Sequence, residues 1–291
     1  MTNGQAKPRR SKMETALSHL IFGTRRLRNY DLAMLILNLA ERGGIDLLKL
    51  AYAQRGILKY RSLEESGEVH FIERVLKDLV PGNPILFDVG ANCGSYSRRL
   101  RQCFPDAAIT AFEPNPEVFA NLVEGLSESR IDCINRGLSS EPGEMELFLT
   151  SSNRQTSHAS VYQGVLSDLH AYADVEKITV GLTTLDQYSL EKGIDRIDFL
   201  KIDTEGHELA VLKGARALLE QNRIGCIQFE FNEMNVISRV WLRDFFDILP
   251  GFTFFRLDTS RLLRLDPYHP REEIFQFQNI VAVPRDRADS L

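Results

Sequence analysis

The sequence predicts an α/β protein with a Rossmann-like, doubly wound, mostly parallel sheet of seven strands, preceded by a helical extension. Three observations support this fold class. Short apolar segments alternate with helical ones from residue 68 onward, which is the pattern of βαβ units. A glycine-rich turn joins the first strand to a helix, and the second strand ends in an acidic residue.

The strands are placed where short apolar runs lie between turn signals. Helices are expected at 68–79, 96–103 and 116–126, with a proline and glycine turn after the first. A further helix follows residue 207, with its buried face formed by Leu209, Leu212, Ala215 and Leu218. The expected strands are 85–89, 109–112, 131–134, 199–202, 226–231, 253–257 and 280–283.

We expect the chain to divide into a basic, helical extension (1–67), an α/β domain (68–286) and a short tail (287–291). Apolar residues at helical spacing within 30–58 predict two or three helices, broken at Gly43 and Gly44. Two roles stay open for the extension. It either caps the domain or forms a homo-oligomer contact, which we favour, or it presents a basic amphipathic surface to a membrane or an anionic lipid carrier.

The charge balance bears on the partners of the protein. The formal net charge is −5, whereas a nucleic-acid-binding protein normally has a basic balance or a basic face. The first twenty residues lack the apolar core and cleavage site of a signal peptide. The apolar run 32–40 is shorter than the ~20 residues that span a bilayer. We therefore expect a cytoplasmic protein that does not bind nucleic acid.

The first expected strand leads into a candidate cofactor site. Asp88 lies near the end of this strand, and the turn Gly90-Ala91-Asn92-Cys93-Gly94 leads through Ser95 and Tyr96 into a helix. Glycines allow a sharp turn and a close approach to a ligand. The spacing G-x-x-x-G differs from the G-x-G-x-x-G of nicotinamide sites and from the P-loop.

The second expected strand ends in Glu113, followed by Pro114 and Asn115. An acidic residue at this place in a doubly wound sheet can accept hydrogen bonds from both ribose hydroxyls of an adenosine. Asp88, one strand away, can balance a positive amino or sulfonium group. Two acidic strand ends therefore select an adenosine ligand without phosphates and with positive charge, which is S-adenosylmethionine.

The segments FDVGANCGSYS, AFEPNP, TTLDQY (183–188) and DFLKIDTEGHELAVLKGA (198–215) resemble the FkbM family of S-adenosylmethionine-dependent methyltransferases. The resemblance covers roughly residues 70–285 and not the N-terminal extension. It implies the class I methyltransferase fold and methylation of hydroxyl groups on sugars and on polyketide or glycolipid natural products.

The end of the strand 199–202 is the expected acceptor side, because ligands of open α/β sheets bind beyond the carboxyl ends of the strands. An alcohol acceptor needs a base to remove its proton. His207 and Glu205 are candidate bases, and Asp203 or Glu205 can orient His207. Asp203 is also expected to contact the cofactor. An insertion between residues 139 and 183, with strand-like segments around a polar tip, supplies a second candidate base, His158.

The next strand ends with Glu230 and Asn232, which are expected to bind the acceptor. Together with Asp203 they offer three oxygen ligands, a set compatible with magnesium. We favour carboxylates that hydrogen-bond a sugar over a divalent metal ion.

The sequence thus predicts an O-methyltransferase for a sugar, a glycan or a glycosylated natural product, with a small-molecule, sugar or glycolipid acceptor. Two alternatives stay open. One is an N-methyltransferase acting on an amino sugar or peptide, since amines need less help from a base. The other is a non-catalytic module that binds S-adenosylmethionine.

Overall fold

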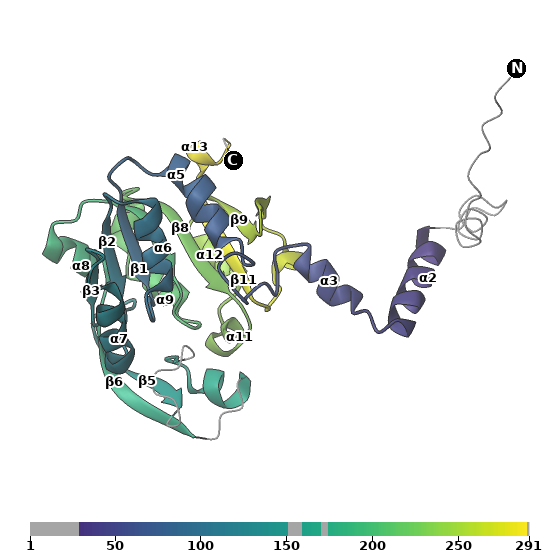
Figure 1. Cartoon of the computed structure of the whole chain (residues 1–291), viewed down its shortest axis with the longest axis horizontal. Helices are drawn as coiled ribbons and strands as arrows, with labels where there is room; N and C mark the ends of the chain where they lie inside the picture. Colours follow the sequence, from purple (N-terminus) through teal and green to yellow (C-terminus); the bar gives the residue numbers. More distant parts are fainter. Residues whose placement is uncertain (1–28, 151–158, 170–173, 290) are drawn as a thin grey trace, which may run out of the picture. The chain divides into compact units, whose positions relative to one another are not determined.

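The computed structural model describes residues 29–150, 159–169, 174–289 and 291. The contacts of the chain group it into two compact units, Met1–Ala51 and Tyr52–Leu291. The described part of the first unit contains helix α2 (Asn29–Arg42) and the start of α3 (Leu47–Ala53) (Figure 1). The predicted break at Gly43 and Gly44 separates the two helices, with Gly44 at φ +67°. No helix in the described ranges is long and apolar enough to cross a membrane.

The second unit is built on an eight-stranded sheet in the order β10-β9-β11-β8-β7-β1-β2-β3. The five strands from β8 to β3 are parallel, and β11 runs antiparallel to both β8 and β9. This confirms the predicted Rossmann-like sheet. The bounds are β1 (Ile85–Val89), β2 (Ala108–Phe112), β3 (Asp132–Ile134), β7 (Ile197–Ile202), β8 (Ile224–Phe231), β9 (Phe252–Asp258), β10 (Arg261–Arg264) and β11 (Gln278–Pro284).

The eighth strand, β10, is one more than the sequence analysis expected. It pairs antiparallel with β9 at the edge of the sheet, so that Arg261 faces Asp258 across a two-residue turn. Its short run of two leucines between arginines gives too weak an alternation to distinguish an edge strand from a loop.

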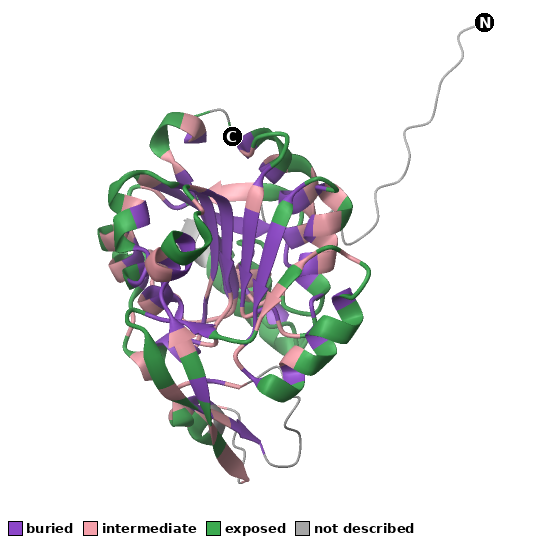
Figure 2. Cartoon of the chain, turned by 90° about the vertical axis from the view of Figure 1, so that its left-hand side faces the viewer, coloured by how far each residue is buried: buried purple, intermediate pink, exposed green. Residues whose placement is uncertain are grey.

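Helices cover both faces of the sheet, whose central strands are almost entirely buried (Figure 2). Along β1, Phe87 and Val89 pack on one face and Leu86 on the other, as the two-residue period of a strand requires. The first face carries α8 (Leu185–Lys192), α9 (Glu208–Lys213), α10 (Arg216–Glu220) and α12 (Leu242–Ile248). The second carries α4 (Glu68–His70), η1 (Phe71–Val75), α5 (Leu76–Leu79), α6 (Ser95–Cys103), α7 (Pro116–Leu126) and α13 (Arg285–Ala288).

Two of the expected helices are interrupted. The segment 68–79 is helical throughout but has a π-helical turn, η1, between α4 and α5. The helix after residue 207 has the predicted buried face but breaks at Gly214 into α9 and α10. The backbone oxygen of Ser139 lies 2.0 Å from where a Cβ on Gly214 would stand, so another part of the chain occupies the space beside this turn.

A second, three-stranded sheet in the order β4-β6-β5 follows β3 in the chain. It contains β4 (Gly137–Leu138), β5 (Gly143–Thr150) and β6 (Val175–Thr183), and the antiparallel pairing of β5 with β6 confirms the expected hairpin. Ser160 forms an isolated bridge with Phe148 of β5. His158 lies outside the described residues. The remaining elements are η2 (Val165–Leu169), α11 (Met234–Ser238) and η3 (Pro270–Glu272).

Candidate functional site

A pocket opens at the carboxyl ends of β1, β2 and β7, where ligands of doubly wound sheets bind. Its opposite wall comes from the small sheet, through Leu147 of β5 and Val180 and Leu182 of β6. Eight of the residues predicted from the sequence line it, namely Gly90, Asn92, Glu113, Pro114, Asn115, Asp203, Glu205 and His207.

The turn after β1 has the conformation that its glycines allow. Gly90 has a φ of +79°, and a Cβ at this position would stand 1.7 Å from the backbone oxygen of Asp203. The backbone amides of Gly90 and Ala91 donate to the carbonyl of Phe112 at 3.0 and 2.9 Å. The turn is therefore held between the ends of β2 and β7, and the missing side chain of Gly90 permits this close approach.

The residues at the end of this turn pack against α6 and α7 on the side away from the pocket. Gly94, also at φ +79°, caps α6, and a Cβ there would stand 2.8 Å from the side chain of Leu122 of α7. Ala91 is buried in the cluster below α7, Ser95 is exposed, and Tyr96 is buried with its hydroxyl donating to Gln228. For Ala91, Gly94, Ser95 and Tyr96, contact with a cofactor stays a prediction.

Glu113 is held at the end of β2 by two backbone amides. Its Oε2 accepts from the amide of Asn92 at 3.0 Å, and its Oε1 from the amide of Asn115 at 2.9 Å. Asn115 in turn caps α7 by accepting from the amide of Glu117. Burial raises the pKa of Glu113 to about 7, against the opposing effect of these amides. Each carboxylate oxygen can accept a second hydrogen bond, so two donors from a ligand can still be received.

Asp88 lies beneath the pocket instead of in its wall. Its side chain is fully buried, Oδ2 accepts from Ser97 at 2.6 Å, and Oδ1 lies 4.0 Å from Nζ of Lys201. Burial raises the pKa of this carboxyl, which the positive charge of Lys201 opposes. A direct contact between Asp88 and a cofactor stays a prediction.

The turn between β7 and α9 brings Asp203 and Glu205 to the pocket. Glu205 adopts a φ of +55°, a conformation that non-glycine residues rarely take and that recurs at functional sites. Its backbone oxygen accepts from the hydroxyl of Ser160 at 2.8 Å. Burial, followed by the charges of Asp203 and Glu208, raises the pKa of Glu205 well above its usual value. A carboxylate of raised pKa is a stronger base than one in water.

His207 also lines the pocket, with both ring nitrogens near protein hydroxyls. Its Nε2 lies 2.9 Å from Oγ of Ser139 and its Nδ1 lies 3.3 Å from the hydroxyl of Tyr162. Burial lowers its pKa to about 4, so the ring is neutral at pH 7. A neutral imidazole has one donor and one acceptor, and here both face hydroxyl groups of the chain. Its role as a base stays a prediction.

Glu230 lies near the end of β8, and Asn232 directly follows the strand. The side-chain nitrogen of Asn232 donates to Glu230 at 3.3 Å, while its side-chain oxygen accepts from the backbone amide of Met234. That oxygen is already engaged by the first amide of α11, which leaves Asn232 a less suitable ligand for a cation. In the described part of the chain, no group of three or more His, Cys, Asp and Glu side chains is arranged to hold a metal ion.

Comparison with known proteins agrees with this geometry. The profile described as the methyltransferase FkbM domain matches residues 88–251. The chain belongs to the FkbM methyltransferase family.

Three curated relatives give the FkbM match more detail. The methyltransferase sdnD of Sordaria araneosa is 31% identical over 46% of this chain and 61% of that protein. The 2-O-methyltransferase NoeI of Sinorhizobium fredii is 28% identical, and the match covers 66% of this chain and 81% of NoeI. The hexuronic acid methyltransferase AglP of Haloferax volcanii is 27% identical, and the match covers 55% of this chain and 62% of AglP. The matches thus span less than two thirds of sdnD and AglP.

Among solved structures, a fibrillarin pre-rRNA processing protein of Methanococcus jannaschii superposes with a TM-score of 0.42 at 12% identity. That match covers 77% of this chain and 76% of the other.

Several residues of this FkbM site were not singled out in the sequence. Ser139, Ser160 and Tyr162 touch the turn 204–207 from segments far away in the chain. Lys201 lies within an apolar strand and donates to Asp203. The sequence contained one sign of the role of Lys201, because a charged residue within a buried strand needs a partner of opposite charge. Ser139 lies in a short polar stretch, and Ser160 and Tyr162 lie at the end of the polar tip of the predicted insertion, where no pattern distinguishes the individual residues.

Proposed function

We propose that this chain is an S-adenosylmethionine-dependent O-methyltransferase that methylates a hydroxyl group of a sugar, a glycan or a glycosylated natural product, including glycolipids. The observation that carries the proposal is a single pocket with Glu113 at the end of β2 and Glu205 at the end of β7. Membership of the FkbM family supports methyl transfer. The names of NoeI and AglP, a 2-O-methyltransferase and a hexuronic acid methyltransferase, support an oxygen on a sugar.

The residues of the pocket fit the cofactor in three respects. Apolar side chains, among them Phe112, Val118 and Leu182, offer a surface for the flat adenine ring. The two oxygens of Glu113 can receive the ribose hydroxyls. The carboxylate of Asp203 can receive the ammonium group.

When bound, S-adenosylmethionine would supply an activated methyl group, carried on a positively charged sulfur, to the acceptor oxygen, with Glu113 holding its ribose and Asp203 its ammonium group. We assign Glu205 the task of taking the proton of the acceptor hydroxyl. Glu205 lines the pocket and its pKa is raised by burial, whereas both ring nitrogens of His207 face Ser139 and Tyr162. The turn places this carboxylate beyond Asp203, so the base and the cofactor site share one loop.

The test measures cofactor binding and methyl transfer separately. Calorimetry with S-adenosylmethionine on the full chain is expected to show binding, and a folded protein that binds none would overturn the proposal. Methyl transfer is then followed with a methyl-labelled cofactor and a panel of neutral sugars, hexuronic acids and amino sugars, with the label located by mass spectrometry.

Glu205→Gln is expected to lower kcat by about 10²–10⁴-fold, the usual contribution of a general base, while the Kd for the cofactor stays within about threefold, well under the tenfold that 1.4 kcal/mol would give. Glu220→Gln, a change at an exposed glutamate paired with Arg216, is the matched control. Full activity in Glu205→Gln, together with label on nitrogen, would favour an amine acceptor instead.

A further inference from the structure

A row of polar side chains crosses the buried middle of the large sheet. Asp88 of β1 pairs in register with Lys201 of β7, which pairs in register with Gln228 of β8. Register partners on adjacent strands point to the same face, so the three side chains stand side by side. All three are buried. Buried polar groups are costly unless they are paired, so the row requires an explanation.

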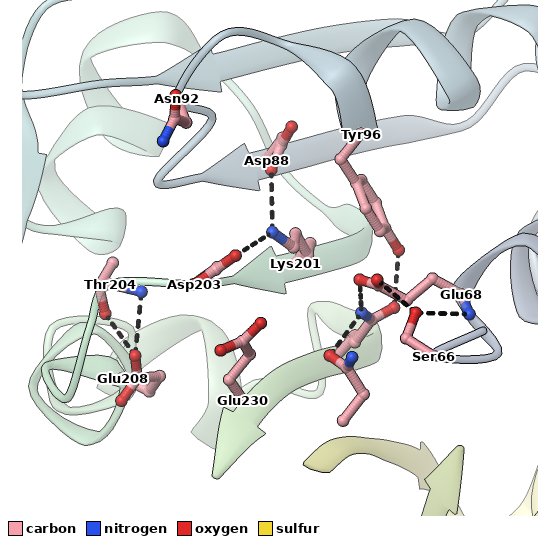
Figure 3. A network of polar contacts seen from close by, with 12 residues as sticks. Ser66, Glu68, Asp88, Asn92, Tyr96, Lys201, Asp203, Thr204, Glu208 and Glu230 are labelled. Carbon is pink, nitrogen blue, oxygen red and sulfur yellow. Dashed lines mark hydrogen bonds and ion pairs between the residues drawn. The ribbon is translucent and has the colours of Figure 1, made fainter. Parts of the chain in front are cut away.

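Tyr96 of α6 covers the row and fixes its geometry. The ring centre lies 4.8 Å from Nζ of Lys201, a cation–π distance, and the hydroxyl donates to Oε1 of Gln228 at 2.6 Å. Gln228 donates onward to Oε1 of Glu68 at 2.8 Å, and Ser66 donates to the other oxygen of Glu68 at 2.7 Å (Figure 3). This chain of hydrogen bonds holds the Tyr96 ring in place. The ring therefore forms one wall of the space that contains the ammonium group of Lys201.

The ammonium group of Lys201 stays charged in this site. Burial alone would lower its pKa, but the carboxylates of Asp203, Asp88 and Glu68 outweigh that effect and raise it. Figure 3 shows Nζ between Asp88 and Asp203. The two distances are unequal. Nζ donates to Oδ2 of Asp203 at 2.8 Å but lies 4.0 Å from Oδ1 of Asp88.

This inequality bears on the role of the lysine. A lysine that served only to neutralise the buried Asp88 would be expected to donate to Asp88. Here the hydrogen bond goes to Asp203, which lines the pocket. The backbone of Asp203 is fixed as well, since its amide donates to the carbonyl of Val89 at 2.9 Å. The main chain and the side chain of Asp203 are thus both held.

We propose that Lys201 is a positioning residue for the cofactor, and that it holds the carboxylate of Asp203 at the pocket wall to receive the cofactor's ammonium group. Asp88 acts one step further back, as the counter-charge that keeps Lys201 in place. A carboxylate that is already oriented loses less conformational freedom when the ligand binds. This inference rests on the proposed function, because the ligand is the cofactor assigned there.

The experiment measures the effect of Lys201→Met in two backgrounds of the full chain. Lys201→Met alone strands the buried Asp88 without a cation and can unfold the protein. We therefore compare Asp88→Asn with Asp88→Asn/Lys201→Met, in which position 88 carries no charge that could be stranded. The second comparison is Asp88→Asn/Asp203→Asn with Asp88→Asn/Asp203→Asn/Lys201→Met, so that position 88 is neutral in both backgrounds. The Kd for S-adenosylmethionine is measured by calorimetry, and the thermal midpoint is measured for every variant.

In the Asp88→Asn background, Lys201→Met is expected to raise the Kd by about tenfold or more, the effect of losing one charge-assisted hydrogen bond at the site. In the Asp88→Asn/Asp203→Asn background the same change is expected to alter the Kd by less than about threefold, because the lysine acts through Asp203. A Kd unchanged in the Asp88→Asn background would overturn the proposal, since Lys201 would then only compensate Asp88. An equal loss in both backgrounds would also overturn it. A wild-type chain that binds no S-adenosylmethionine would overturn the proposed function as well, which keeps the two failures distinct.

Discussion

Glu113 is the residue whose chemistry is most directly tied to pH. Burial raises its pKa to about 7, and its two oxygens are fixed by the amides of Asn92 and Asn115. A protonated carboxyl has lost part of its acceptor capacity. If the ionised form receives the ribose hydroxyls, cofactor affinity is complete above pH 7 and is lost as the pH falls below it.

We therefore expect the Kd for S-adenosylmethionine to rise by up to ~tenfold between about pH 8 and about pH 6, as one proton competes with the ligand. Calorimetry across this range measures it. Glu113→Gln cannot ionise, so this variant is expected to bind weakly at every pH with a flatter profile. A wild-type profile as flat as that of Glu113→Gln would contradict the assignment of the ribose to Glu113.

The residues that the sequence predicted and those that it did not differ in how their positions are set. Glu113, Asp203 and Gly90 lie at strand ends, and the order of a doubly wound sheet brings strand ends together whatever the rest of the chain does. Lys201 and Tyr162 act through side-chain contacts with partners that the strand order does not specify. Asp88 shows that a strand position alone does not decide whether a side chain reaches the pocket. Its position in β1 was predicted, but its side chain is buried beneath α6, where it accepts from Ser97.

Among the elements, the segment 159–162 ties the small sheet to the turn 204–207. Ser160 is fully buried, and its hydroxyl donates to the backbone of Glu205 and accepts from the amide of Tyr162 at 3.2 Å. Its own backbone pairs with Phe148 of β5. One serine thus connects the pocket's outer wall to the residue that we assign as the base.

Ser160→Ala is expected to lower the free energy of unfolding by about 1–3 kcal/mol, because two part-buried backbone groups, the carbonyl of Glu205 and the amide of Tyr162, lose a partner. It is also expected to lower kcat more than it raises the Kd for the cofactor, since the turn at Glu205 loses its support. Urea unfolding and steady-state kinetics measure the two effects. Ser127→Ala, which removes a hydroxyl bonded to the carbonyl of Glu124 at an exposed position, is the control. Equal behaviour of the two variants would show that the segment does not support the turn.

The elements themselves were mostly predictable, and the exceptions have physical reasons. The expected bounds of β1 and α7 agree with the structure, because a strongly apolar strand and a Pro-initiated amphipathic helix have clear ends. The break at Gly214 was not predicted, and the close approach of the distant carbonyl of Ser139 to that glycine is a tertiary contact that the local sequence does not show.

At the scale of the whole molecule, the sequence placed the domain start at residue 68, whereas the compact unit begins at Tyr52. The residues between them contribute to the packing of this unit. Ile57 is fully buried, and the amide of Leu58 donates to the carbonyl of Phe277 at 2.8 Å. Lys59 pairs with Asp258 at 2.5 Å. Gly56 lies so close to β9 that a Cβ would stand 2.0 Å from the carbonyl oxygen of Leu257.

Two truncated chains therefore test where the domain begins. The fragment 52–291 retains every strand and the whole pocket, so we expect it to fold and to bind S-adenosylmethionine as the full chain does. The fragment 68–291 loses the burial of Ile57, worth about 1.5–3 kcal/mol, together with the Lys59 pair and the hydrogen bond to Phe277. Its midpoint in urea is expected to be clearly lower than that of 52–291. Equal midpoints would support the boundary at residue 68 and would mean that residues 52–67 only lie against a domain that is complete without them.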